Sequence, residues 1–200
     1  MNFSNICNRI FQEATLKYHK TDDVDAQPAN PYKNGEIEFL LFSKNWIDAV
    51  QWHLEDIIRD PKINPTEALT IKRRIDKSNQ ERTDLVEFID GYFMDKFKGV
   101  KVLPGAGLNT ETPAWAVDRL SILALKIYHM EQETLRPDAT AQHLESCKQK
   151  HETLLTQRED LSRAIDELLA DIEAGKKYMK LYKQMKMYND PTLNPVLYKK

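Results

Sequence analysis

Apolar residues recur every three or four positions along most of this chain, which is the spacing of one face of an α-helix. We therefore expect helices over five segments: 3–19, 37–59, 65–98, 113–135 and 138–174. With 200 residues the chain is long enough to bury one substantial core. The predicted fold class is all-α, an elongated helical bundle that forms a single domain over residues 1–200.

Proline positions mark several of the expected helix ends. Asp60-Pro61 should close the second helix, because the residue before a proline disfavours the α conformation. Asn64-Pro65 and Thr112-Pro113 each place a capping side chain directly before a proline, which is typical of a helix start. The third and fourth helices are therefore expected to begin at these two pairs.

The fourth and fifth predicted helices should pack against each other. The fourth is apolar nearly all round, which indicates the most buried helix of the bundle. The fifth, over 138–174, carries a heptad pattern of apolar residues from Leu144 to Ile172, with His151 and Arg158 in the seam as register-setting residues. Because only a short break at Arg136-Pro137 separates the two helices, we expect a long antiparallel helical hairpin.

Three other segments lack a helical pattern. Residues 21–36 are acidic and contain two prolines, so we expect a flexible loop that is too polar to bury. Residues 99–112 contain three of the six glycines and should form an irregular loop with a short extended piece at 100–103. Residues 189–200 read as a proline-punctuated tail.

The basic segment 176–186 carries five lysines and allows several interpretations. As a helix, it would place its lysines on one side and its tyrosines, with Leu181 and Met185, on the other. It then forms a terminal helix docked on the bundle, or a patch for an anionic ligand, phosphate or lipid headgroup. Nucleic acid is a third interpretation.

Composition narrows the class of protein further. Apolar residues make up 41% and charged residues 30%, and the net charge of −2 gives no reason to expect nucleic acid as a partner. Cys7 and Cys147 lack metal-ligand spacing and are expected to be free thiols. We find neither a signal peptide nor an apolar run of about 18 residues, so we expect a cytoplasmic protein without a transmembrane segment.

Polar residues on apolar helix faces indicate where a site could lie. Asn79 and Arg82 fall on the apolar face of the third helix, and Asp118 interrupts the fourth. His53 and Asp56 lie at the edge of the apolar stripe of the second. Since buried polar groups need partners, we expect these five side chains to form one cluster in which Arg82 contacts an aspartate.

Three chemistries remain open for this cluster. It could be an ion-pair network that only specifies packing. It could bind an anionic or sugar ligand through Asn79, Arg82, Asp118 and Thr112, with His53 and Asp56 as acid and base. It could also hold a divalent cation at His53, Glu55 and Asp56.

The loop 99–112 is expected to border the same cleft. It ends at Thr112, where the start of the fourth helix offers free N–H groups to an anion. The alternative is a plain connection that needs its glycines for turns.

Four long strings carry a resemblance to a known bacterial family: WHLEDIIR, RIDKSNQERTDLVEFID, NTETPAWAVDRLSILALKIYHM and MKLYKQMKMYNDPTLNPVLY. Over nearly its full length, the chain resembles the domain of unknown function 4254 family. That family has no established activity, and its members are usually encoded among glycosyltransferases and other genes of cell-surface polysaccharide assembly. The resemblance implies a helical protein of glycan or lipopolysaccharide biosynthesis, and it brings no catalytic residues with it.

Two functions of different classes follow as expectations. The first is an accessory protein of surface-glycan synthesis that binds a sugar-nucleotide, a glycan intermediate or a glycosyltransferase. The second is an enzyme, a metal-dependent hydrolase or transferase acting on a phosphorylated sugar or nucleotide. A homodimer is an assembly that either function would allow.

Overall fold

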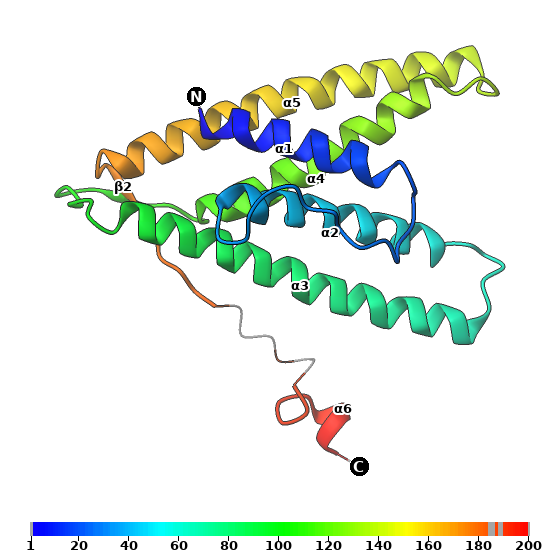
Figure 1. Ribbon diagram of the computed structural model, residues 1–200, viewed down its shortest axis with the longest axis horizontal. Helices are drawn as coiled ribbons and strands as arrows, with labels where there is room; N and C mark the ends of the chain where they lie inside the picture. The colour runs from blue at the N-terminus through cyan, green and yellow to red at the C-terminus, as the bar shows by residue number, and fades with distance from the viewer. Residues whose placement is uncertain (1, 184–186, 188–189, 200) are drawn as a thin grey trace.

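The computed structural model, which describes residues 2–183, 187 and 190–199, contains five long helices (Figure 1). They are α1 (Phe3–Tyr18), α2 (Ile37–Ile57), α3 (Pro65–Phe97), α4 (Pro113–Thr134) and α5 (Ala141–Glu173). A two-stranded parallel sheet joins β1 (Gly107–Leu108) to β2 (Lys177–Tyr178), and a short helix α6 (Pro195–Tyr198) lies near the C-terminus. The predicted all-α class is confirmed.

The predicted helix starts are confirmed at Pro65 and Pro113. At α3, the Asn64 side chain accepts a hydrogen bond from the Thr66 amide at 2.8 Å. The expected start of the fifth helix at residue 138 is wrong by three residues. Thr140 caps α5 instead, because its hydroxyl accepts a hydrogen bond from the His143 amide at 3.2 Å.

The expected antiparallel hairpin is present, with α4 and α5 packed along each other (Figure 1). Within the heptad seam, the side chains of Cys147, Ile165 and Ile172 are buried. His151 and Arg158 are half-buried, so the seam accommodates both polar residues at its edge.

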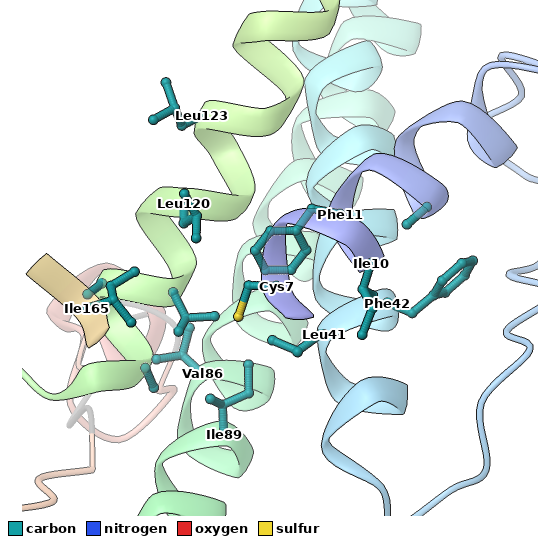
Figure 2. Packing of buried hydrophobic residues seen from close by; sticks show 14 of the residues in the cluster. Cys7, Ile10, Phe11, Leu41, Phe42, Val86, Ile89, Leu120, Leu123 and Ile165 are labelled. Carbon is teal, nitrogen blue, oxygen red and sulfur yellow. The ribbon is translucent and has the colours of Figure 1, made fainter. Parts of the chain in front are cut away.

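The main core lies where all five helices meet, around α1 (Figure 2). Cys7 and Phe11 of α1 are fully buried beside apolar side chains of α2, α3 and α4. Cys7 and Cys147 are both free thiols, as predicted. The first turn of α1 is fixed by α5, because Asp166 accepts hydrogen bonds from the Ser4 amide at 3.0 Å and the Ser4 hydroxyl at 2.6 Å.

The acidic segment 21–36 is attached to the bundle at several points. Asn30 Nδ2 donates to the carbonyl of Phe39 at 3.0 Å and to the hydroxyl of Ser43 at 3.1 Å. The Tyr32 hydroxyl donates to Glu13 at 2.6 Å. The flexibility of this loop stays a prediction.

The helix expected over the basic segment is wrong for residues 176–183. The chain leaves α5 at Gly175, where a positive φ of 70° turns it out of the helical path. Residues 177–178 then pair with 107–108, so the extended piece expected at 100–103 lies further along the same loop. Met185, Lys186 and Tyr188 lie outside the described residues. Among the described helices, none combines the length and hydrophobicity needed to cross a membrane.

We predict that Gly175→Ala destabilises the protein more than Gly105→Ala. Both glycines have positive φ, 70° and 81°, which a side chain disfavours by about 1 kcal/mol. A Cβ at Gly175 would also collide with the backbone oxygen of Lys101, whereas a Cβ at Gly105 meets nothing within 4 Å. Urea unfolding should show an additional loss of about 1–3 kcal/mol for Gly175→Ala. Equal losses for the two variants would contradict the tight approach at residue 175.

Candidate functional site

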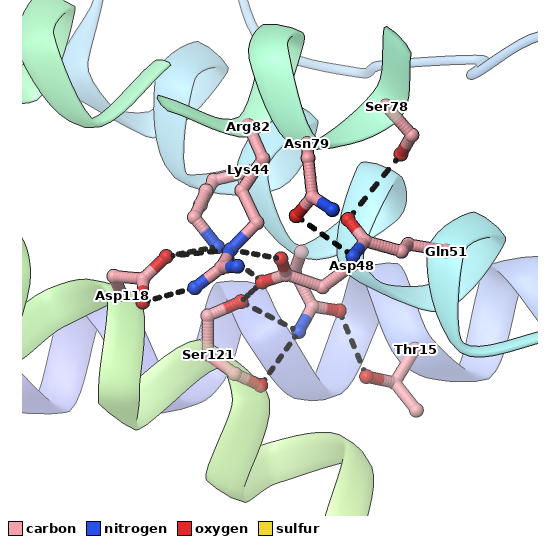
Figure 3. A network of polar contacts seen from close by, with 10 residues as sticks. Thr15, Lys44, Asp48, Gln51, Ser78, Asn79, Arg82, Asp118 and Ser121 are labelled. Carbon is pink, nitrogen blue, oxygen red and sulfur yellow. Dashed lines mark hydrogen bonds and ion pairs between the residues drawn. The ribbon is translucent and has the colours of Figure 1, made fainter. Parts of the chain in front are cut away.

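Arg82 projects from α3 into the space between α2 and α4 (Figure 3). Its Nε donates to Asp118 Oδ1 at 3.0 Å and its Nη2 to Asp118 Oδ2 at 2.7 Å, so the pair is bidentate. The contact predicted between Arg82 and an aspartate is confirmed. The Arg82 side chain is 25% exposed, whereas that of Asp118 is 4% exposed.

A second ion pair lies deeper in the bundle and was missed in the sequence. Lys44 of α2 is fully buried, and its Nζ contacts Asp48 Oδ2 and lies 3.0 Å from Asp118 Oδ1. Asp48 Oδ1 lies 3.4 Å from Arg82 Nε. Two cations and two carboxylates therefore compensate each other, which a buried charge requires. We call Lys44, Asp48, Arg82 and Asp118 the charge quartet.

Hydrogen bonds extend the charge quartet to α1 (Figure 3). The Ser121 hydroxyl donates to Asp48 Oδ2 at 2.6 Å. Asn45 Nδ2 donates to that hydroxyl at 3.1 Å, and the Thr15 hydroxyl donates to Asn45 Oδ1 at 2.8 Å. The polar network thus joins α1, α2, α3 and α4.

The environment pushes the pKa values of the two quartet carboxyls in opposite directions. Burial raises the pKa of Asp48, and the neighbouring Lys44 ammonium offsets this only in part. Burial also acts to raise the pKa of Asp118, but the Lys44 and Arg82 charges outweigh it and hold that pKa below its usual value. Asp118 is thus the fixed anion, and Asp48 is the carboxyl more readily protonated.

A cleft of about 290 Å³ lies over the exposed side of Arg82. Its lining consists of Asp48, Gln51, Trp52, Glu55, Asp56, Arg59, Arg82, Ile122 and Leu125. Arg59 pairs with Glu55 at 2.6 Å across solvent-exposed side chains. The cleft therefore presents two guanidinium groups, three carboxylates and one indole.

The predicted cluster is only partly assembled. Arg82, Asp118 and Asn79 share one polar region, because Gln51 of the cleft donates to Asn79 Oδ1 at 2.9 Å. Asp56 lines the cleft as well. His53 is absent from the cleft lining, and its Nε2 lies 3.7 Å from Asp22 Oδ1.

Among the described residues, His53, Glu55 and Asp56 do not form one metal-ligating group, so the predicted metal set is not assembled. His53 lies outside the cleft that Asp56 lines, and the acid–base pair of His53 and Asp56 stays a prediction. Glu55 is two positions after His53, and at about 100° per residue it points to nearly the opposite side of the helix. Asp56 lies one turn after His53 on a neighbouring face, at the boundary between the cleft and the side of α2 that meets Asp22. Glu55 and Asp56 line the cleft, whereas His53 faces Asp22.

Thr112 belongs to a different part of the surface. Its hydroxyl donates to Asp90 Oδ2 at 2.8 Å, beside a second cleft of about 510 Å³ that Asn109, Trp115 and Lys180 help to line. In the described part of the chain this cleft shares no residue with the Arg82 cleft, so the expected common cleft is wrong. Asp118 lies about 9 Å further along α4 than Thr112, and the β1–β2 pairing holds the loop at the end of α5.

Three of the five histidines meet at the opposite end of the bundle from this loop, and the sequence did not reveal this. The His19 ring centroid lies 5.4 Å from that of His53 and 5.0 Å from that of His129. Trp52 stacks on His129 at 4.5 Å. Burial lowers the pKa of His19, and it takes the pKa of His129 to about 4, with the nearby His19 and His53 acting in the same direction. The one signal in the sequence was His129, which interrupts the apolar pattern of the fourth helix.

Fold and site together define an all-α bundle with a buried charge quartet beneath a polar cleft. The family model for a protein of unknown function (DUF4254) matches residues 38–181, and the chain belongs to this family. The matched region contains the charge quartet and the whole lining of the cleft. Searches of curated proteins and of solved structures found no match.

We predict that Lys44→Met lowers the free energy of unfolding by about 3–5 kcal/mol at pH 7, because Asp48 and Asp118 would share one cation. The lowered pKa of Asp118 means that its stabilisation is present above its ordinary pKa of 3.8 and is lost as pH falls through the lower folded value. The difference in the free energy of unfolding between the wild type and Lys44→Met should therefore become smaller below about pH 4. Lys126→Met, on the exposed side of α4, is the control. A wild-type urea midpoint for Lys44→Met at pH 7 would contradict the buried pairing.

We also predict that Asp90→Asn stabilises the protein increasingly as pH rises from 4 to 7. Burial raises the pKa of Asp90 from 3.8 to about 6, so ionising it costs stability that is absent below 3.8 and complete above about 6. Asparagine keeps an acceptor for the Thr112 hydroxyl and has no charge to desolvate. The free energy of unfolding of Asp90→Asn should exceed that of the wild type by at most about 3 kcal/mol. Asp95→Asn, exposed on the same helix, should show no such pH dependence in urea unfolding.

Proposed function

We propose that this chain binds a negatively charged, glycan-related ligand, such as a sugar-nucleotide, in the Arg82 cleft. The observation that carries the proposal is the lining itself, which combines guanidinium groups, carboxylates and an indole in about 290 Å³. In this role the protein is an accessory factor of bacterial surface-glycan synthesis that holds a glycan intermediate or presents it to a glycosyltransferase. The biosynthetic context follows from the family resemblance of the sequence.

The two guanidinium groups supply recognition of phosphate. Arg82 uses Nε and Nη2 to hold Asp118, and its third nitrogen, Nη1, takes part in neither bond. Arg59 is exposed at the rim, where its pairing with Glu55 costs little to exchange for a phosphate. A planar guanidinium matches a phosphate through two parallel hydrogen bonds, so both side chains suit an anionic ligand.

The other lining groups suit a sugar. The carboxylates of Glu55 and Asp56 accept hydrogen bonds from hydroxyl groups, and Gln51 can both donate and accept. Trp52, Ile122 and Leu125 give the cleft an apolar side for the C–H face of a pyranose ring. The volume lies near the small end of ligand pockets, which suits the sugar and phosphate part of a sugar-nucleotide rather than a long glycan.

The charge quartet opens to solvent on the side of the cleft. Here Lys44 is fully enclosed, whereas Arg82 keeps a quarter of its side chain exposed at the cleft. The quartet thus fixes the orientation of Arg82, and a guanidinium held in advance loses little conformational entropy when it binds a ligand.

We predict that a panel of sugar-nucleotides, for example UDP-glucose and UDP-N-acetylglucosamine, includes a ligand that raises the melting temperature of the wild-type protein. Arg59→Gln should weaken its binding about tenfold in calorimetry, the loss of one charge-assisted contact. Arg119→Gln is the matched control, because Arg119 is exposed on α4 and pairs with Glu111 away from the cleft. Equal affinities for both variants, or no shift with any compound at millimolar concentration, would reject the cleft as the binding site.

A further inference from the structure

Three metal-ligating atoms converge at the end of α1. His19 Nε2 lies 3.9 Å from Asp22 Oδ1, and His53 Nε2 lies 3.7 Å from the same oxygen. All three donor atoms lie within 4.8 Å of one another. They come from the C-terminal end of α1, the turn that follows it and the last two turns of α2, so only the folded chain brings them together.

The hydrogen bonds of the two imidazoles direct their free lone pairs toward this point. His19 Nδ1 lies 2.7 Å from the carbonyl oxygen of Thr15, and His53 Nδ1 lies 3.0 Å from that of Ala49. A carbonyl oxygen only accepts, so each Nδ1 carries the hydrogen and each neutral ring keeps its lone pair on Nε2. Histidines that bind metals are commonly held in this way by a backbone carbonyl.

Buried polar atoms without a hydrogen-bond partner are concentrated around the same point. Among the described residues, six such side-chain atoms occur, and four of them belong to Tyr18, His19, Trp46 and His129. The ring of Tyr18 contacts those of His19 and Trp46, and the His19 ring contacts that of His129. An unpaired polar atom in a native interior needs an explanation, and a bound ion is one that His19 Nε2 fits.

We propose that His19, His53 and Asp22 form a binding site for a divalent transition-metal ion, foremost Zn²⁺. Tetrahedral Zn²⁺ with bonds of about 2.0–2.1 Å places its ligands about 3.4 Å apart, so the two measured separations must shorten by only a few tenths of an ångström. Two imidazoles and one carboxylate favour Zn²⁺ over Mg²⁺ and Ca²⁺, which prefer oxygen ligands. The site is separate from the Arg82 cleft and does not rest on the proposed function.

The three ligands differ in exposure in a way that would let an ion enter the site from solvent. The side chain of Asp22 is 57% exposed, that of His53 21% and that of His19 6%. Asp22 also has a positive φ of 49°, a conformation that aspartate tolerates better than most residues and that the turn after α1 imposes. The ion would tie this turn to α2.

Within the described residues, one other cluster of metal-ligating groups could also bind zinc. In the hairpin, His143 Nε2 lies 3.0 Å from Glu133 Oε2 and 3.3 Å from Cys147 Sγ. A carboxylate only accepts, so His143 Nε2 carries the hydrogen that it donates to Glu133, and this nitrogen has no lone pair to offer, unlike Nε2 of His19 and His53. His143 therefore provides the matched control.

The test uses the full-length protein stripped of metal by a chelator and titrated with Zn²⁺ in calorimetry. We expect one ion per chain, a raised melting temperature and no comparable binding of Mg²⁺. Asp22→Asn and His53→Ala should each weaken Zn²⁺ binding at least tenfold. Since Asp22 is an exposed loop residue, its variant should fold normally, which circular dichroism will verify.

The His143→Ala variant should bind Zn²⁺ as the wild type does. The spectrum of bound Co²⁺ should lack the thiolate charge-transfer band that Cys147 would give. Loss of binding in His143→Ala with retention in Asp22→Asn and His53→Ala would overturn the proposal, as would the absence of Zn²⁺ binding by the wild type. Neither result would affect the sugar-nucleotide test, because Arg59 and Arg119 lie outside this cluster.

Discussion

The structure depends on the requirement that the buried ammonium of Lys44 be neutralised inside the bundle. Its side chain is fully enclosed, so an unpaired charge there would cost several kcal/mol. Asp48 on the same helix and Asp118 on α4 supply two carboxylates, and Arg82 from α3 supplies the second cation that they need. Three helices must therefore adopt one register relative to each other, since a shift along any axis separates charges that cannot reach water. Apolar packing alone tolerates such shifts more easily.

This constraint gives the cleft its chemistry. Arg82 donates hydrogen bonds to the buried Asp118, and the exposed side of its guanidinium lines the cleft. Trp52, Asp56 and Arg59 line the same cleft. One guanidinium thus belongs both to the interior and to the surface. The same arrangement explains why a structural network and a ligand site look alike in the sequence: the residue types are identical, and what separates them is exposure on one side.

Much of the fold was predictable from local patterns. Helix starts at Pro65 and Pro113 follow from capping chemistry, and the contact of Arg82 with Asp118 follows from two polar residues on apolar faces. Lys44 escaped prediction because a lysine in an amphipathic pattern normally lies on the solvent side. The histidine cluster escaped because it joins the end of one helix to two others, and no spacing within a helix encodes it. The basic segment was misread because Gly175, after the last heptad, turns the chain into a pairing with residues some 70 positions earlier.

The family match begins at residue 38, after the whole of α1, yet one face of α1 is buried against the helices that do match. Phe11 is fully buried in the core. The Thr15 hydroxyl donates to Asn45 of the polar network, and the Ser4 hydroxyl donates to Asp166 of α5. The matched region is thus smaller than the set of helices that share the core. A fragment that begins at the edge of the match would expose the apolar faces of α2, α4 and α5 that pack on α1, and Asn45 Oδ1 would lose the hydrogen bond from Thr15. A fragment for recombinant expression should therefore include every helix that contributes buried side chains to the core. For this chain, that means keeping α1 although the match starts after it.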